Sequence, residues 1–376
     1  MARANSHTSV ALIVGVTGMV GCSLVELLKK PTTSGGPWKV YGMARRQLPE
    51  WFPSFLLDDF VAVDALDNND TIEKLGPLAP KVTHVFWVAI QLCEDEQVNV
   101  TSNSTMLNNV LGTLKSDPRS PLKHISLQTG TKHYMGPIFD PSLAGQLVNH
   151  EPPYREDMAR LPYPNFYYAL EDLVASYSPS VTYSVHRSSI IIGASSRSFH
   201  NALLTLAVYA TICRYQGLPF RYPGSKYTWE HFCDMSDAEV LAQQHVWAAV
   251  TDKAKNQAFN CTNGDVFTWK SVWRVLSEAF DLEFVPFDDE DERFDWVGFM
   301  KDKEKVWEEI MEKYGLIQTR VKDATCPEAC SIVLHLGFQH VCSMNKSREF
   351  GFFGYADTLK SIPIWVQRLR DMKIIP

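Results

Sequence analysis

A short apolar segment followed by three evenly spaced glycines constrains the fold of this chain more than any other feature. Residues 10–14 read Val-Ala-Leu-Ile-Val, which is typical of a strand buried on both faces. Gly15, Gly18 and Gly21 follow, and an amphipathic segment then continues to about Lys30. Glycine permits a tight turn and a close approach of backbone to a diphosphate at a helix N-terminus. The segment therefore predicts a dinucleotide-binding turn, and the alternative is a plain strand-to-helix connection.

Apolar strands alternate with longer helical patterns through the first half of the chain. We expect further strands over residues 39–44, 60–63, 84–88, 124–128 and 181–185, and helices over residues 103–114 and 165–176. This order is typical of a parallel sheet covered by helices on both faces. The predicted fold class is α/β, with a Rossmann-type doubly wound sheet of the extended short-chain dehydrogenase kind.

The alternation weakens beyond residue 192, where amphipathic helices dominate. Residues 269–280 and 305–314 are examples. We therefore expect a nucleotide-binding domain over residues 1–192, with returning segments near 229–265, and a smaller, mainly helical substrate-binding part over residues 193–376. The acidic run at residues 288–292 is predicted to be a solvated loop or a helix entry.

The composition narrows the class of protein and its partners. The chain is 45% hydrophobic and 21% charged, and it has no uninterrupted apolar run near the ~20 residues that span a bilayer. The net charge of −7 disfavours nucleic acid or an anionic membrane as the main partner. Residues 1–9 are polar and lack the apolar stretch of a secretory signal. We expect a cytosolic protein with a small-molecule substrate.

The eight cysteines are scattered, as expected of free thiols in a reducing compartment. Cys326 and Cys330 form the only close pair, and a zinc site would need two further ligands that no comparable spacing supplies. No metal site is predicted.

The end of the second predicted strand indicates which dinucleotide binds. An acidic residue there would accept a hydrogen bond from the ribose 2′-hydroxyl of NAD, but this chain has Arg45 and Arg46. Guanidinium groups bind phosphate oxygens in a bidentate fork, so the pair predicts NADPH. The alternative is two solvated surface arginines. Asp64, after the third strand, is placed to accept from the adenine amino group.

The catalytic region departs from the Tyr-x-x-x-Lys pattern of ordinary short-chain reductases. Tyr167 and Tyr168 are each followed four residues later by an acid, Glu171 and Asp172, which would raise the pKa of a phenol. Lys132, in the loop after the fifth strand, can restore the missing positive charge beside Tyr167 and lower that pKa. A surface lysine is the alternative interpretation.

Several longer motifs resemble the plant progesterone 5β-reductase/iridoid synthase family, an atypical group of extended short-chain dehydrogenases. The similarity runs along nearly the whole chain. The motifs are Lys-His-Tyr-Met-Gly-Pro at 132–137, Asn-Phe-Tyr-Tyr at 165–168, Trp-Ala-Ala at 247–249, Phe-Asn-Cys-Thr-Asn-Gly-Asp at 259–265 and Ser-Met-Asn-Lys-Ser at 343–347.

The resemblance implies NADPH-dependent 1,4-reduction of the C=C bond in enones or enals, with steroid-like or monoterpenoid substrates such as 8-oxogeranial, and a homodimer. Lys132 and Tyr167 would be the catalytic pair, with hydride added to the β-carbon and the enolate oxygen stabilised by Tyr167. The implied substrate contacts are Lys132, Tyr167, Ile90 and Phe338. The implied cofactor contacts are Gly15, Thr17, Gly18, Met19, Val20, Arg45, Arg46, Asp64, Ala65, Thr129, Tyr167, Ser189, Ile190 and Ile191.

Three segments differ from the family pattern. Ile90 stands where the family usually has a tryptophan, residues 326–330 replace a segment that tends to hold paired tryptophans, and Ser188 replaces a proline after His-Arg. Phe299 and Met300 could join Phe338 in an apolar pocket, although core packing is the favoured interpretation for each of them.

Two other functions remain open from the sequence. The first is 1,2-chemistry, either carbonyl reduction or sugar-nucleotide epimerisation, which the missing Tyr-x-x-x-Lys lysine disfavours. The second is a non-catalytic protein that senses NADPH, which the retention of Lys132 and Tyr167 disfavours.

Overall fold

The computed structural model describes residues 9–143, 145–289 and 293–376. Outside this range lie residues 1–8 and residues 290–292. The prediction about a secretory signal depended mainly on the first segment, and the second belongs to the acidic run. Within the described range, no helix is both long enough and apolar enough to cross a membrane.

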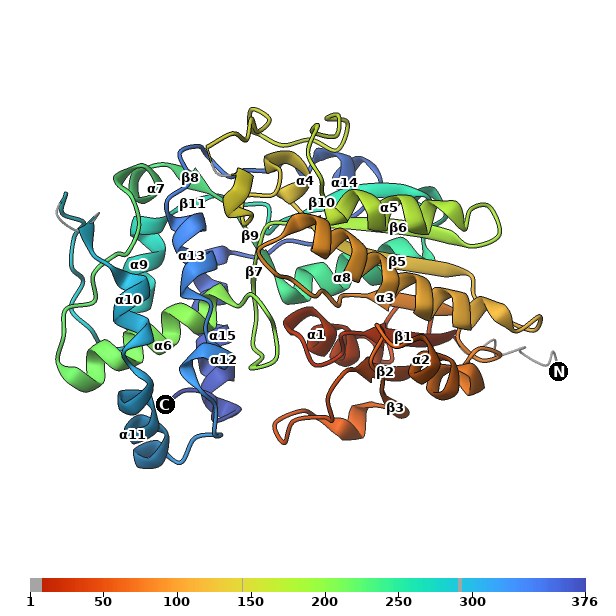
Figure 1. The fold of residues 1–376 in the computed structure, drawn as a ribbon, viewed down its shortest axis with the longest axis horizontal. Helices are drawn as coiled ribbons and strands as arrows, with labels where there is room; N and C mark the ends of the chain where they lie inside the picture. Colours follow the sequence, from red (N-terminus) through yellow and green to blue (C-terminus); the bar gives the residue numbers. More distant parts are fainter. Residues whose placement is uncertain (1–8, 144, 290–292) are drawn as a thin grey trace.

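A seven-stranded parallel sheet forms the centre of the N-terminal part (Figure 1). The first strand lies inside the sheet. The chain adds the next two strands on one side of it and the later strands on the other side, which is the doubly wound arrangement predicted from the sequence. In sheet order the strands are β10 (Gln257–Cys261), β6 (Thr182–Ser188), β5 (His124–Gly130), β4 (His84–Trp87), β1 (Ser9–Val14), β2 (Trp38–Ala44) and β3 (Asp59–Ala62). The predicted fold class is confirmed.

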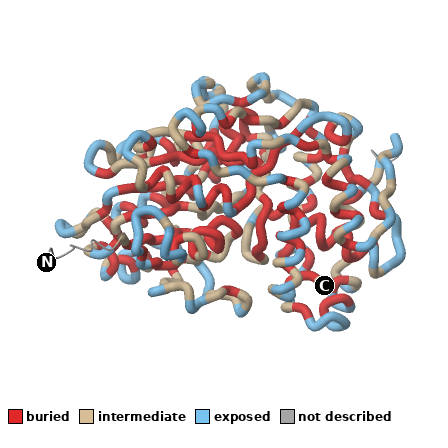
Figure 2. Tube along the Cα trace, turned by 180° about the vertical axis from the view of Figure 1, so that it is seen from behind, coloured by how far each residue is buried: buried red, intermediate tan, exposed pale blue. Residues whose placement is uncertain are grey.

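Helices cover both faces of this sheet, and alternate residues of β1 point to opposite cores. Leu12 packs with the face covered by α2 (Asn68–Leu75), α3 (Glu96–Ser116) and α5 (Phe166–Ser176). Ile13 packs with the face covered by α1 (Met19–Leu28) and α8 (Ala238–Val250). Because both faces are covered, residues 10–14 of the strand are all apolar. Figure 2 shows the sheet as the buried centre of this part.

The rest of the described chain is mainly helical and packs beside the sheet (Figure 1). Aromatic rings fill its core: Phe220 and Trp273 stack with their centroids 4.0 Å apart, and Trp307 is fully buried. Its helices are α6 (Ala202–Gln216), α7 (Lys226–Glu230), α9 (Trp269–Ala279), α10 (Trp296–Lys301), α11 (Glu304–Tyr314), α12 (Val321–Ala324), α13 (Pro327–Leu334) and α15 (Thr358–Asp371).

Segments from the second half of the chain return to the sheet. The edge strand β10 pairs with β6, and α14 (Asn345–Glu349) packs against β10. Two small sheets connect the parts: β7 (Ile190–Ile192) runs parallel to β9 (Met235–Asp237), and β8 (Phe232–Cys233) runs antiparallel to β11 (Phe267–Thr268). The division into a nucleotide-binding and a substrate-binding domain stays a prediction.

Candidate active site

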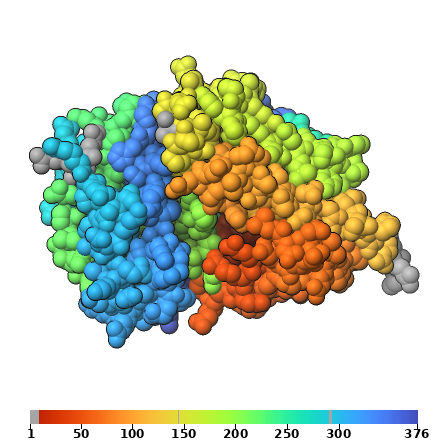
Figure 3. Space-filling model, viewed as in Figure 1, coloured from red at the N-terminus to blue at the C-terminus, as the bar shows by residue number. Residues whose placement is uncertain are grey.

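The residues predicted to carry chemistry lie on loops that leave the carboxyl ends of neighbouring parallel strands. Gly15 follows β1, Ile90 lies in the loop after β4, Lys132 follows β5 and Ser189 follows β6. The carboxyl ends of parallel strands meet at one edge of the sheet, and ligands bind doubly wound folds there. The surface in Figure 3 is hollowed where the orange part of the chain meets the green and blue parts.

The glycine turn has the geometry that a dinucleotide requires. Gly15 has a φ of 93°, and a Cβ there would lie 2.9 Å from the amide nitrogen of Ala89. A Cβ on Gly21 would lie 2.6 Å from the carbonyl oxygen of Val16, so only glycine lets α1 pack this closely on the turn. The backbone of residues 15–18 is thus free to approach a diphosphate at the N-terminus of α1.

A serine-rich loop that was not predicted as part of the site lies against this turn. Ser198 Oγ accepts a hydrogen bond from the N–H of Met19 at 3.0 Å, and Ser195 Oγ donates to the carbonyl oxygen of Thr17 at 2.7 Å. The loop follows β7 and precedes α6, so it brings the helical part of the chain to the glycine turn. The only feature of the sequence that could have indicated this loop is its group of serines, Ser195, Ser196 and Ser198.

Arg45 and Arg46 lie directly after β2, exposed at the edge of the sheet. Partial burial lowers the pKa of Arg46, as do the nearby charges of Arg197 and Arg45. The charge of Arg197 thus acts on Arg46 together with that of Arg45, while Asp323 acts in the opposite direction; the excess of positive charge favours an anion. Asp64 is exposed two residues after β3, and its Oδ1 accepts from the N–H of Leu66 at 3.1 Å.

The structure brings the predicted catalytic pair together. Lys132 begins α4 (Lys132–Met135), and Tyr167 lies in the first turn of α5. Asn165 joins the two elements: its Oδ1 accepts from the N–H of Tyr167 at 3.0 Å, and its Nδ2 donates to the carbonyl oxygen of Lys132 at 2.9 Å. The Lys132 ammonium lies 5.4 Å from the centroid of the Tyr167 ring and 4.1 Å from that of Phe166.

The Lys132 ammonium is paired with an acid that the sequence did not reveal as part of the site. Glu96 Oε1 and Oε2 lie 2.7 and 2.6 Å from Lys132 Nζ, and both side chains are buried. Burial lowers the pKa of Lys132 to about 8, while the Glu96 carboxylate acts in the opposite direction. The lysine therefore stays largely protonated at neutral pH.

Tyr167 is a neutral phenol. Burial raises its pKa, and the Glu96 carboxylate raises it further. This direction is opposite to the one predicted from the sequence, because burial of the phenol has the largest effect on its pKa and the nearby Glu96 carboxylate acts in the same direction. Within the described ranges the Tyr167 hydroxyl makes no hydrogen bond, so its donor is available to a ligand.

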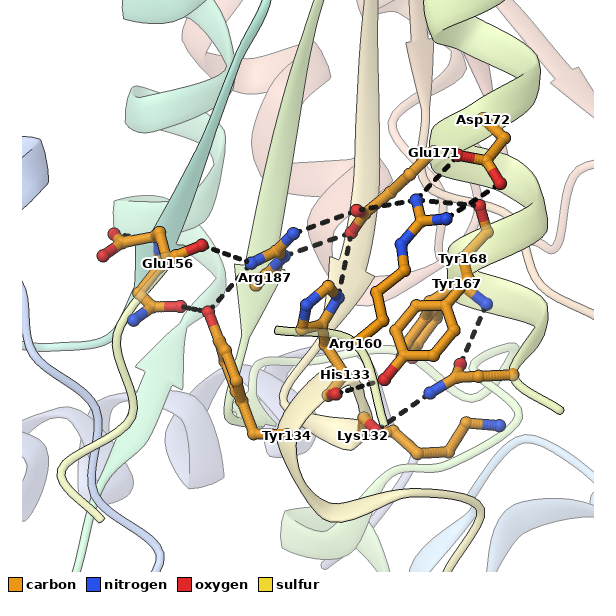
Figure 4. A network of polar contacts seen from close by, with 12 residues as sticks. Lys132, His133, Tyr134, Glu156, Arg160, Tyr167, Tyr168, Glu171, Asp172 and Arg187 are labelled. Atoms are coloured by element: carbon orange, nitrogen blue, oxygen red, sulfur yellow. Dashed lines mark hydrogen bonds and ion pairs between the residues drawn. The ribbon is translucent and has the colours of Figure 1, made fainter. Parts of the chain in front are cut away.

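The two acids after the tyrosines do not act as the sequence suggested. Glu171 turns away from Tyr167 and forms a bidentate pair with Arg187, at 3.1 and 2.9 Å, while Asp172 pairs with Arg160 (Figure 4). Burial would raise the pKa of Glu171, but the contact with His133 and the charge of Arg187 outweigh it and hold the pKa near 2.

Tyr168, His133 and Tyr134 make internal hydrogen bonds and ring contacts. The Tyr168 hydroxyl donates to the carbonyl oxygen of His133 at 2.6 Å and accepts from the N–H of Leu161 at 3.0 Å. His133 packs edge-on against Tyr168, and the buried Tyr134 hydroxyl donates to Asn260 Oδ1 at 2.6 Å. Tyr167 and Tyr168 are adjacent in sequence, but among the described residues only the hydroxyl of Tyr168 forms hydrogen bonds with other parts of the protein.

The remaining predicted cofactor contacts lie along the same edge. Thr129 is buried near the end of β5, and its hydroxyl has no partner among the described residues. The N–H of Ser189 donates to Ser236 Oγ at 2.8 Å, and Ile190 and Ile191 are paired with β9. Ala65 is buried after β3, and its carbonyl oxygen accepts from Asn109. Whether these residues, Val20 and Asp64 bind a cofactor stays a prediction.

The predicted substrate contacts fall into two groups. Ile90 is half-buried just after β4, and Phe338 packs against the cluster of Tyr134, Met135, Tyr154 and Cys342, beside the element that carries Lys132. Met300 is fully buried in the core of the helical part, and Phe299 packs against that core, so the core-packing interpretation holds for both.

The altered segment at residues 326–330 lies at the start of α13. Cys326 Sγ is 3.7 Å from Cys330 Sγ and 3.4 Å from Thr205 Oγ1. Over the described ranges, no three His, Cys, Asp or Glu side chains are grouped so that they could hold a metal ion.

His200 also lies near the catalytic pair and was not predicted. Burial lowers its pKa to about 4, and the charge of Lys132 contributes. Its ring is 5.2 Å from that of Phe139, in the connection between α4 and α5. No motif marks His200, Arg197 or Glu96 in the sequence, because the first two come from the loop between β7 and α6, and Glu96 comes from the start of α3.

The sheet order and the glycine turn define a protein with a doubly wound Rossmann fold. Known structures agree in fold: an epimerase from Methanothermobacter thermautotrophicus superposes with a TM-score of 0.64 at 13% identity, covering 98% of this chain and 95% of the other. UDP-glucose 4-epimerase from Thermotoga maritima gives 0.64 at 13% identity, covering 96% and 99%.

The chain belongs to the family of PRISE-like Rossmann-fold domains, which it matches over residues 11–376. It is 43% identical over 373 residues to an (S)-8-oxocitronellyl enol synthase from Catharanthus roseus, covering 99% of this chain and 93% of the relative. It is also 43% identical over 375 residues to a 3-oxo-Δ(4,5)-steroid 5β-reductase from Arabidopsis thaliana, covering 99% and 94%. The family resemblance seen in the sequence is confirmed.

Proposed function

We propose that this protein reduces the C=C bond of enones or enals with NADPH, and that Lys132 and Tyr167 form its catalytic pair. Family membership and relatives named as an enol synthase and a steroid 5β-reductase support this activity. The structural observation that carries the proposal is the state of Tyr167, a protonated phenol with no internal partner at the ligand-binding edge of the sheet.

The environment of Tyr167, a phenol beside Glu96 without a hydrogen-bond partner among the described residues, favours one of two kinds of chemistry. Alcohol oxidation and its reverse use a phenol that exchanges its proton readily, which requires a lowered pKa. Reduction of an enone needs only a donor aimed at the carbonyl oxygen, where negative charge develops as an enolate. A buried phenol whose pKa is raised is a poor base but a persistent donor.

Each catalytic group has one task in this mechanism. NADPH, when bound, supplies the hydride that adds to the β-carbon of the substrate. Tyr167 donates a hydrogen bond to the carbonyl oxygen and stabilises the enolate, and the Lys132–Glu96 pair holds a protonated ammonium beside the tyrosine ring. The α-carbon needs no side-chain acid, because the enolate oxygen can take a proton from water, and the resulting enol can leave the site and tautomerise.

The preference for NADPH over NADH is proposed from the basic cluster after β2. Arg45, Arg46 and Arg197 place three guanidinium groups near one another, and no acidic residue follows β2 directly to bind a ribose 2′-hydroxyl. A 2′-phosphate would accept bidentate hydrogen bonds from such groups. The glycine turn and the N-terminus of α1 would hold the diphosphate.

NADPH consumption with 2-cyclohexen-1-one, progesterone and 8-oxogeranial, with identification of each product, tests the proposal. Saturated carbonyl products, or the enol-derived product of 8-oxogeranial, support 1,4-reduction. An allylic alcohol would instead indicate 1,2-reduction. Tight NADPH binding without turnover of any substrate would indicate a sensor and overturn the proposed activity.

A further inference from the structure

A single carboxylate connects the two elements that carry the catalytic pair. Glu96 is the first residue of α3, its side chain is only 3% exposed, and both its oxygens contact Lys132 Nζ. Oε1 also accepts from the N–H of Phe166 at 2.8 Å, and Oε2 accepts from Asn99 Nδ2 at 3.3 Å. Glu96 thus contacts the lysine side chain and the helix N-terminus next to Tyr167.

The contact with Phe166 matters because the N–H of Phe166, at the start of α5, has no acceptor within its own helix and is satisfied by Glu96. Asn165 satisfies the next one, the N–H of Tyr167, and bonds the backbone of Lys132. Glu96 makes the corresponding link through the lysine side chain. Two independent bridges therefore join α4 to the first turn of α5, and only the Glu96 bridge determines where the ammonium lies.

Glu96 is itself held in place from a third element. Its own N–H donates to Oδ2 of Asp140 at 3.1 Å, in the connection that follows α4. Asp95 caps the helix by accepting from the N–H of Val98 at 2.9 Å. The carboxylate therefore has a fixed direction, and Lys132 has no other acidic contact within hydrogen-bond distance among the described residues.

We infer that Glu96 is a positioning residue of the active site, which keeps the Lys132 ammonium charged and directs it along the ring of Tyr167. This inference rests on the proposed function. An ordinary buried ion pair would be a weak contributor to stability, because the desolvation of two charges offsets most of their attraction. This ion pair differs in its location, because the Glu96 carboxylate bonds Lys132 and also the N–H of Phe166, the residue before Tyr167, and so fixes where the ammonium lies relative to the tyrosine.

The charged and titratable groups around Lys132 determine what loss of Glu96 should do. They are Glu96 on α3, Asp140 after α4, Tyr167 on α5 and His200 before α6. Burial lowers the pKa of Lys132, and Glu96 followed by Asp140 opposes that effect. Glu96→Gln keeps the shape of the side chain but removes its charge. The pKa of Lys132 should then fall below its wild-type value, and that of Tyr167 should fall with it.

The first test does not depend on turnover. Competitive labelling with acetic anhydride, followed by mass spectrometry of the peptide that contains Lys132, gives the pKa of its amine in the wild type and in Glu96→Gln. A lower pKa in the variant supports the inference, and an unchanged pKa overturns it. If the wild type reduces no enone, the proposed function fails while this result still stands.

The second test measures enone reduction as a function of pH. In Glu96→Gln we expect kcat to fall roughly 100-fold, as for a displaced catalytic group, with the NADPH dissociation constant little changed. The alkaline limb of the kcat profile should move to lower pH. Glu171→Gln is the matched control, because it removes a buried carboxylate on α5 that pairs with Arg187 instead, and its alkaline limb should stay in place.

A double-mutant cycle covers the case in which Glu96→Gln does not fold. Glu96→Gln/Lys132→Met removes both charges, so no uncompensated charge stays buried. If Glu96 acts through Lys132, the double variant should have the same kcat as Lys132→Met alone. A further large loss of kcat in the double variant would show an effect of Glu96 that does not pass through Lys132, and would overturn the inference.

Discussion

The adjacent tyrosines of α5 offer a test in which two nearly identical substitutions should have opposite effects. Tyr167→Phe removes a hydroxyl that makes no hydrogen bond within the described ranges, so little stability should be lost. Tyr168→Phe removes a hydroxyl that bonds both His133 and Leu161. At about 1 kcal/mol for each hydrogen bond, the free energy of unfolding should fall by ~2 kcal/mol in this variant.

The catalytic effects should be reversed. Loss of one preorganised donor to an enolate oxygen costs about 3–4 kcal/mol of transition-state stabilisation, which corresponds to a fall in kcat of roughly 100- to 1000-fold. Tyr167→Phe should show this loss with an unchanged dissociation constant for NADPH. Tyr168→Phe should keep kcat within about tenfold of the wild type at temperatures where it stays folded.

Two measurements on each variant are sufficient. The rate of NADPH oxidation with a saturating enone gives kcat, and urea unfolding followed by tryptophan fluorescence gives the free energy of unfolding. Wild-type turnover in Tyr167→Phe would show that Tyr167 is not the donor. A severe loss of kcat in Tyr168→Phe, with normal stability, would transfer the catalytic role to the neighbouring tyrosine.

Three further predictions follow from charges and hydrogen bonds in the structure. Replacing Arg45 and Arg46 together by alanine should weaken binding of NADPH far more than that of NADH, measured by fluorescence titration; equal weakening would remove both residues from the phosphate site. Burial lowers the pKa of His186 from 6.5 to about 4, so its contribution to stability is complete above pH 6.5 and is lost as pH falls toward 4. Between pH 6.5 and 4 the wild type should therefore lose ~3 kcal/mol more unfolding free energy than His186→Asn, measured by urea unfolding at each pH. An identical pH dependence in both proteins would show that the pKa of His186 is not lowered by folding. Arg187→Met should lower the free energy of unfolding by about 3 kcal/mol, because Glu171 stays buried and loses its bidentate partner while keeping only the longer contacts with His133 and Arg160, and Arg187→Met/Glu171→Leu should recover most of that loss in urea unfolding.

Much of the fold could be predicted because it depends on local patterns. The apolar run before Gly15 and the alternation of strands and helices located β1 to β6, with differences only at their ends. The start of α3 was predicted wrongly: the helix was expected from residue 103 but begins at Glu96, because residues 96–102 are mostly polar and their two valines do not have helical spacing. That missing helical turn carries the acid that pairs with Lys132.

The sequence by itself determined the Rossmann class, the glycine turn and the family, since these depend on residue types at short, regular spacings. It also identified Lys132 and Tyr167 as the catalytic candidates. Only the tertiary structure decided which charges face one another: Glu96 reaches Lys132 from 36 residues away, and Glu171 pairs with Arg187 rather than influencing Tyr167. The physical reason is that the pKa of a buried group depends on burial and on neighbours a few ångströms away, and folding brings those neighbours from distant parts of the chain.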